Sequence, residues 1–198
     1  MVAFFVDYLI QKEVLEEEER EDSIYGLTLL MEKVIACVLL ISIAVLVGKP
    51  ISGIIFIVSF MTLRQMTGGY HVESFIGCLV GSAFTLFIAL EAAAPMMQKH
   101  TWGQMTFFLP ACACIWWYAP VNHPNLCLSV EEQREYKRWS RYGLAIECVL
   151  IGLGYLLRMR WQRYIMIAII FCAVYIITAK VMGQEVKDYE KKGRKSDS

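Results

Sequence analysis

The chain lacks the features that mark secreted, disulfide-bonded or nucleic-acid-binding proteins. Its first residues, MVAFFVDYLIQKEVLEEEE, have neither the positively charged start nor the small-residue cleavage site of a signal peptide, so we expect no segment to be removed. The seven cysteines are odd in number and show no paired spacing, which argues against a disulfide framework. No Lys/Arg patch alternates with aromatic residues and the formal net charge is zero, so we exclude nucleic acid as a partner.

The usual spacing of metal ligands is also missing. Cys112 and Cys114 are two residues apart, which on a helix turns their thiols about 200° away from each other. His100 and His123 lie in predicted loops without a matching ligand set. We therefore predict no metal site and no cofactor, and we interpret the two cysteines as core packing.

Charge is scarce, whereas apolar residues are abundant. Only 19% of the 198 residues are charged and 57% are hydrophobic, and the mean hydropathy is +0.47. Soluble domains are roughly half apolar and about one quarter charged. We therefore predict an all-α polytopic integral membrane protein that forms a single membrane domain over 1–198.

Long apolar runs predict about six transmembrane helices. The first run begins after Ser23 and stops at Gly48-Lys49-Pro50, a strong helix-ending sequence. The second run is short, since thirteen helical residues reach about 20 Å against a hydrocarbon core of about 30 Å, so it must extend to Met66 or stop short. The predicted spans, which form a bundle over 24–181, are 24–47, 51–66, 74–97, 105–119, 143–157 and 161–181.

The two ends of the chain differ from this bundle. Apolar residues recur at helical spacing in 2–15, which predicts an amphipathic helix lying in the surface of the lipid bilayer. With the acidic run that follows, it forms an N-terminal arm over 1–22, and a charged tail occupies 182–198. Six crossings place both termini and the loops 64–74 and 120–142 on one side. Because most Lys and Arg residues fall there, the positive-inside rule predicts that this side is cytoplasmic.

One polar stretch between two apolar runs, RQMTGGYHVESFIGC over 64–78, contains a histidine and a cysteine. An imidazole that removes the proton of a thiol creates a nucleophile for attack on a carbonyl carbon. On an unbroken helix, however, His71 and Cys78 would be separated by about 10 Å along the axis. The pair can react within one chain only if the helix is interrupted.

The same stretch offers that interruption. Gly68 and Gly69 disfavour helix and permit positive φ, and Ser74 is a suitable N-cap for the third span. His71 then lies on a turn over the helix start, and Cys78 lies in the first or second turn, where free N–H groups favour a thiolate. The alternative is that Cys78 is a packing residue and His71 is solvated.

This stretch resembles the accessory gene regulator B (AgrB) family of bacterial membrane endopeptidases. The likeness is carried by Arg64, the pair Gly68-Gly69, His71 after one intervening residue, and Cys78 after six more.

A second stretch, YAPVNHPNLCLSVEEQREYKRWS over 118–140, is similar to the loop after the fourth span of that family, followed by a charged helix. The matching residues are Ala119-Pro120, Asn125 and Leu128-Ser129. At Leu126-Cys127 the chain departs from the family, which tends to have a basic residue followed by proline there.

The resemblance implies a cysteine endopeptidase of the bacterial cytoplasmic membrane, with its active site on the cytoplasmic side. It would remove the acidic C-terminal tail of a small propeptide in quorum sensing, with His71 as general base and Cys78 as nucleophile. A thiol or hydroxyl of the peptide would then attack the thioester and release a thiolactone or lactone autoinducing peptide. The resemblance also implies a homodimer, in which His71 and Cys78 can instead meet across protomers.

Supporting roles follow for neighbouring residues. Arg64 either anchors substrate and polarises a carbonyl, or only extends its charge to the membrane surface. Glu73 either orients His71 or is solvated, and Gly69 suits a close approach of the backbone. A basic run either holds the acidic propeptide tail or is an ordinary feature of a cytoplasmic loop; its residues are Arg134, Lys137, Arg138 and Arg141.

A second hypothesis is a non-catalytic peptide exporter or membrane scaffold, in which 64–78 is only a tight interhelical turn. An exporter needs polar residues along an aqueous pathway, whereas charges within the spans are almost confined to Glu32, Lys33, Glu91 and Glu147. This scarcity favours the enzyme. Glu147, which is costly in lipid, marks either a polar pathway or a helix contact, or pairs with a basic neighbour.

Overall fold

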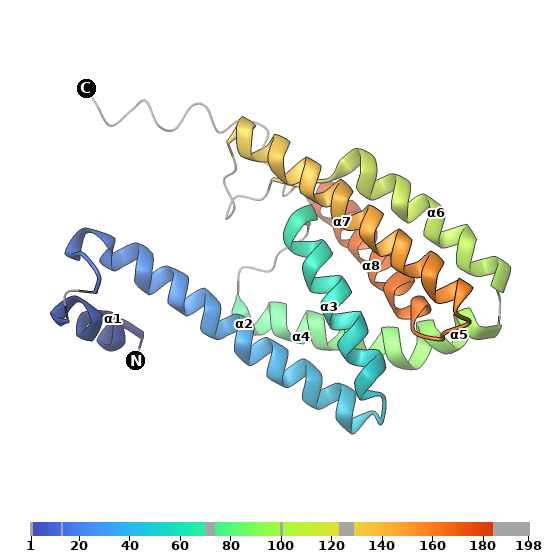
Figure 1. Ribbon diagram of the computed structural model, residues 1–198, viewed down its shortest axis with the longest axis horizontal. Coiled ribbons are helices and arrows are strands. Elements are labelled where there is room, and N and C mark those ends of the chain that lie inside the picture. Colours follow the sequence, from blue (N-terminus) through green and yellow to red (C-terminus); the bar gives the residue numbers. More distant parts are fainter. Residues whose placement is uncertain (1, 13, 70–73, 100, 123–128, 184–198) are drawn as a thin grey trace.

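The structure, a computed structural model, describes residues 2–12, 14–69, 74–99, 101–122 and 129–183 (Figure 1). Its elements are α1 (Val2–Gln11), the 3₁₀ turn η1 (Glu17–Glu19), α2 (Arg20–Leu46), α3 (Pro50–Thr67), α4 (Phe75–Ile88), the π-helical segment η2 (Ala89–Ala93), α5 (Ala94–Lys99), α6 (Thr101–Tyr118), α7 (Val130–Leu156) and α8 (Gln162–Val181). These residues form no strand, only one isolated parallel bridge between Gly68 and Val121. The prediction of an all-α protein is confirmed.

The turns that separate α2, α3 and α4 follow from the local sequence. Gly48 adopts a φ of 74° after α2, and Pro50 is the first residue of α3, where its missing N–H needs no acceptor. Gly68 follows α3 with a φ of 67°. The side chain of Ser74 caps α4 by accepting a hydrogen bond from the Gly77 N–H at 3.1 Å, as predicted.

Within the described residues, four helices are long and apolar enough to cross a membrane: α2, α3, the continuous helix Phe75–Gln98, and α8. They correspond to the first, second, third and sixth predicted spans. α3 extends to Thr67, so the short second run does borrow residues beyond Leu63. The predicted spans 105–119 and 143–157 correspond to α6 and the second half of α7, which are not among these four, so the total of six crossings stays a prediction.

α8 lies in the middle of the bundle, packed against α3, α6 and α7 (Figure 1). Its residues Met166, Ile169 and Ile176 are fully buried, as are Leu63 of α3 and Ile115 of α6. In a membrane such a core is held by close van der Waals packing, because lipid is as apolar as the side chains. The burial of α8 therefore fixes the positions of the three helices around it.

α2 joins the bundle through a contact between small residues. Ala44 lies so close to Gly53 of α3 that a Cβ atom at position 53 would collide with the Ala44 side chain. Beside this contact, Lys49 Nζ donates hydrogen bonds to Glu91 Oε1 and to the Leu90 carbonyl, each at 2.8 Å. Small residues let membrane helices approach closely, so this contact and the ion pair hold α2 against α3 and η2.

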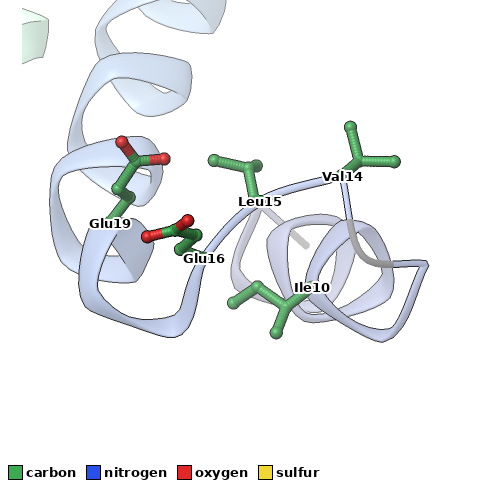
Figure 2. Close-up of a pocket in the computed structure, with 5 residues that line it drawn as sticks. All are labelled: Ile10, Val14, Leu15, Glu16 and Glu19. Atoms are coloured by element: carbon green, nitrogen blue, oxygen red, sulfur yellow. The ribbon is translucent and has the colours of Figure 1, made fainter.

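The N-terminal arm lies away from the bundle, at the far end of α2 (Figure 1). α1 packs against α2, and Arg20 Nε donates a hydrogen bond to Asp7 Oδ1 at 2.8 Å. Phe4, Phe5 and Tyr8 are exposed, as the predicted interfacial helix requires. A groove of about 550 Å³ lies where the chain passes from α1 into η1. Figure 2 shows the residues that line it: Ile10, Val14, Leu15, Glu16 and Glu19.

Candidate functional site

The end of α3 directs Arg64 toward α8. Its guanidinium carbon lies 4.3 Å from the centre of the Tyr175 ring and 6.0 Å from that of Phe60. Cation–π contacts of this kind are typical of Arg on aromatic rings. The side chain therefore packs onto an aromatic ring of the bundle.

Gly68 and Gly69 form the turn that the sequence predicts. Their φ angles of 67° and 119° both lie in the left-handed region, which only glycine adopts readily. The Gly68 N–H bonds to the Arg64 carbonyl at 3.0 Å and so ends α3. A Cβ at position 69 would lie 3.1 Å from Arg64 Nη1 and 3.4 Å from Tyr175. At Gly69 it is therefore the positive φ, more than the space around the residue, that favours glycine.

This turn is joined to the segment that follows α6. The Val121 N–H donates a hydrogen bond to the Thr67 carbonyl at 3.0 Å, which forms the bridge between Gly68 and Val121. A Cβ on Gly68 would lie 2.5 Å from the Val121 carbonyl oxygen. Thr67 and Val121 are fully buried. The two sequence stretches that carry the family resemblance are thus in direct contact.

Cys78 occupies the first turn of α4, as predicted. It is the fourth residue of the helix that Ser74 caps, and its N–H bonds to the Ser74 carbonyl at 3.0 Å. The side chain is half-buried. Cys78 therefore lies at a helix start, where unsatisfied N–H groups and the positive end of the helix dipole are found.

The remaining predicted members of the site, His71 and Glu73, lie outside the described residues. Their pairing with Cys78 therefore stays a prediction. The structure does place both ends of the segment 70–73: Gly69 against Tyr175, and Ser74 at the start of α4.

Sequence reasoning missed Tyr175 and Thr85. The Tyr175 hydroxyl lies 2.9 Å from Thr85 Oγ1 of α4, and the ring lies under Arg64. A signal was available, because a tyrosine inside an apolar span needs a hydrogen-bond partner for its hydroxyl. The sequence could not say that this partner is on α4.

The other polar groups that the sequence singles out lie deeper in the bundle. Cys112 lies beside Cys148 of α7 and both are free thiols, and Cys114 is buried against α8. Glu147 is only 6% exposed, and among the described residues its Oε2 has no hydrogen-bond partner. No basic side chain among the described residues is therefore bonded to Glu147 Oε2.

The start of α7 lies beside the end of α3. A groove of about 280 Å³ is lined there by Gln65, Met66, Glu135, Tyr136 and Trp139. Of the basic run, Arg134, Lys137 and Arg138 are exposed. Arg141 instead stacks on the Trp116 ring at 4.6 Å. Three of the four cations are therefore exposed, and the fourth joins α7 to α6.

Comparison with known proteins assigns the chain to the same family that its sequence motifs resemble. The sequence model of the family described as Accessory gene regulator B matches residues 3–183. An AgrB-like protein of Halalkalibacterium halodurans is 26% identical over 138 residues, which cover 70% of this chain and 68% of the relative. AgrB-like proteins of Listeria innocua and Listeria monocytogenes serotype 4a are 23% and 24% identical over 190 residues, covering 93% of this chain and 92% of each relative.

No solved structure matches this chain. The family match, by contrast, covers nearly all of it, including both stretches that meet at the turn between α3 and α4. The chain therefore belongs to the accessory gene regulator B (AgrB) family, which supports a role in the agr quorum-sensing system.

Proposed function

We propose that the protein is a membrane cysteine endopeptidase that cleaves the C-terminal tail from a small quorum-sensing propeptide and promotes its cyclisation. Cys78 is the nucleophile and His71 the general base. The observation that carries the proposal is the position of Cys78 in the capped first turn of α4, just beyond the segment that contains His71.

The first half of the reaction forms a thioester. His71 accepts the thiol proton of Cys78, and the sulfur attacks the carbonyl carbon of the scissile peptide bond. The C–N bond then breaks, and the imidazolium returns its proton to the departing amine of the tail. The N-terminal part of the propeptide stays attached to Cys78 as an acyl group.

The second half releases a ring. A thiol or hydroxyl of the peptide attacks the thioester carbonyl, and its proton passes through His71 to the departing sulfur of Cys78. The product is a thiolactone or a lactone, and the enzyme thiol is restored. Atoms balance without an added oxidant, reductant or cofactor.

Substrate binding uses charges at the same end of the bundle. Arg64 polarises a carbonyl or holds a peptide carboxylate, since a guanidinium suits both tasks. The exposed cations Arg134, Lys137 and Arg138 of α7 attract the acidic tail. The protein acts from the cytoplasmic side of the membrane as a homodimer.

The test is cleavage of the cognate propeptide by protein purified into lipid nanodiscs. We expect Cys78→Ala and His71→Ala to abolish release of the tail, because each removes one partner of the nucleophilic pair. The matched control is Cys37→Ala, which removes a half-buried thiol from α2 and leaves the site intact. Wild-type rates in Cys78→Ala would refute the proposal, and intact peptide transported across proteoliposomes would instead support the exporter.

A further inference from the structure

We propose that Tyr175 of α8 is a positioning residue of the Cys78 site, a role that rests on the proposed function. Its ring supports the Arg64 guanidinium and the Gly69 turn, and its hydroxyl ties both to the face of α4 that carries Cys78.

The ring of Tyr175 organises the end of α3. Arg64 lies over it at 4.3 Å, and the Phe60 ring packs beside it with 5.7 Å between ring centres. A Cβ at position 69 would lie 3.4 Å from both Cβ and the backbone carbon of Tyr175. Gly69 therefore lies directly against Tyr175 of α8.

The hydroxyl of Tyr175 reaches α4. Thr85 Oγ1 donates its own hydrogen to the Gly81 carbonyl at 2.8 Å, so it accepts the hydrogen of Tyr175 at 2.9 Å. Cys78, Gly81 and Thr85 are spaced by three and four residues, which places them on one face of α4. The hydrogen bond therefore fixes α8 against the face of α4 on which Cys78 lies.

Tyr175 is thus a link between the two flanks of the segment that carries His71. On one flank it holds Gly69 and Arg64, and on the other it holds α4 through Thr85. A displacement of about 1 Å in a catalytic arrangement can lower a rate on the order of 100-fold. Loss of this link would change the position of Arg64 and of the turn relative to the Cys78 sulfur without removing any reacting group.

The experiment separates the hydroxyl from the ring. Tyr175→Phe removes only the bond to Thr85, and Tyr175→Leu also removes the support for Arg64. With the cognate propeptide in nanodiscs, we expect kcat to fall about 3- to 10-fold in Tyr175→Phe and on the order of 100-fold in Tyr175→Leu, with KM within about twofold of wild type. Thr85→Val should match Tyr175→Phe, and the double variant should be no slower than either, because both remove the same bond.

The matched control is Tyr155→Phe. Tyr155 of α7 also donates its hydroxyl hydrogen inside the bundle, to Gln104 Oε1 at 2.7 Å, but this bond does not involve α3 or α4. We expect Tyr155→Phe to keep the wild-type kcat. An equal fall in kcat for Tyr155→Phe and Tyr175→Phe, or additive losses in the double variant, would overturn the proposal.

A second readout does not depend on the propeptide. The rate at which iodoacetamide alkylates Cys78, followed by mass spectrometry of the peptide that contains it, reports the surroundings of the thiol. We expect this rate at pH 7 to change at least about threefold in Tyr175→Leu and not in Tyr155→Phe. An unchanged rate would count against Tyr175 alone, whereas cleavage by Cys78→Ala would count against the proposed function. If Tyr175→Leu does not fold, the kcat values of Tyr175→Phe, Thr85→Val and their double variant provide the test, because these changes remove only the bond between the two hydroxyls.

Discussion

Both the backbone conformation and the space around it require glycine at position 68. Its φ of 67° and ψ of −143° lie in a region that essentially only glycine occupies. A Cβ there would also lie 2.5 Å from the carbonyl oxygen of Val121. Because that oxygen belongs to the backbone, it cannot move aside without breaking the bond between Val121 and Thr67.

We therefore expect Gly68→Ala to lower the free energy of unfolding by about 1–3 kcal/mol, measured by thermal unfolding in detergent micelles. The control is Gly152→Ala in α7, where a Cβ meets nothing within 4 Å. Alanine favours a helix interior by about 0.5–1 kcal/mol over glycine, so this variant should be as stable as wild type or more stable. Equal behaviour of the two variants would contradict the role given to Gly68.

The residues of the site differ in how far the sequence could predict them. The glycine turn, the Ser74 cap and the place of Cys78 follow from local rules, since each depends on neighbours in the chain. The contacts made by Val121 and Tyr175 depend on how α6 and α8 pack. No periodicity within one helix specifies its partner, so these contacts required the structure.

Among the elements, α7 shows best how local chemistry fixes a helix end. Ser129 and Glu132 form a capping box: the Ser129 N–H bonds to Glu132 Oε2 at 2.8 Å, and the Glu132 N–H bonds to Ser129 Oγ at 3.3 Å. The helix then runs unbroken to Leu156, so the predicted charged helix and the predicted span from Gly143 are one element. Gly143 sits close to Met66, which lets α7 continue past α3.

The cap of α7 should depend on pH. The hydrogen bond from the Ser129 backbone N–H lowers the pKa of the Glu132 carboxyl. A lowered pKa in the folded state means that the cap stabilises the helix above the unfolded value of about 4.3, and that this effect is lost as the pH falls through the folded-state pKa. We expect amide exchange at Ser129 and in the first turn of α7, corrected for intrinsic rates, to accelerate over this range.

The matched control for the cap is Glu132→Gln. Glutamine keeps an oxygen acceptor for the Ser129 N–H but has no charge to lose, so its exchange rates should stay constant over the same range. An identical pH profile for wild type and Glu132→Gln would show that another group controls the start of α7.

At the scale of the whole molecule, the contacts divide the bundle into two ends. At one end, Thr67 bonds to Val121, Arg141 stacks on Trp116, and Lys180 Nζ lies 5.0 Å from the Tyr118 ring. Contacts at the other end join Lys49 to Glu91, Arg163 to Gln98, and Tyr155 to Gln104. α6 and α7 each take part in contacts at both ends. They therefore run alongside α3 and α8, but neither is among the four described helices that are long and apolar enough to cross a membrane, so their crossing stays a prediction.

Labelling from each side of the membrane tests this arrangement. In a variant without the seven native cysteines, we introduce Ser129→Cys before α7 or Arg160→Cys after it. If α7 crosses, a membrane-impermeant maleimide should label Ser129→Cys only from the cytoplasmic side and Arg160→Cys only from the outside. Val149→Cys, exposed in the middle of the predicted span 143–157, should react from neither side because lipid surrounds it. Labelling of both ends from one side would mean that α7 does not cross the membrane. α8 would then be the only crossing after residue 129.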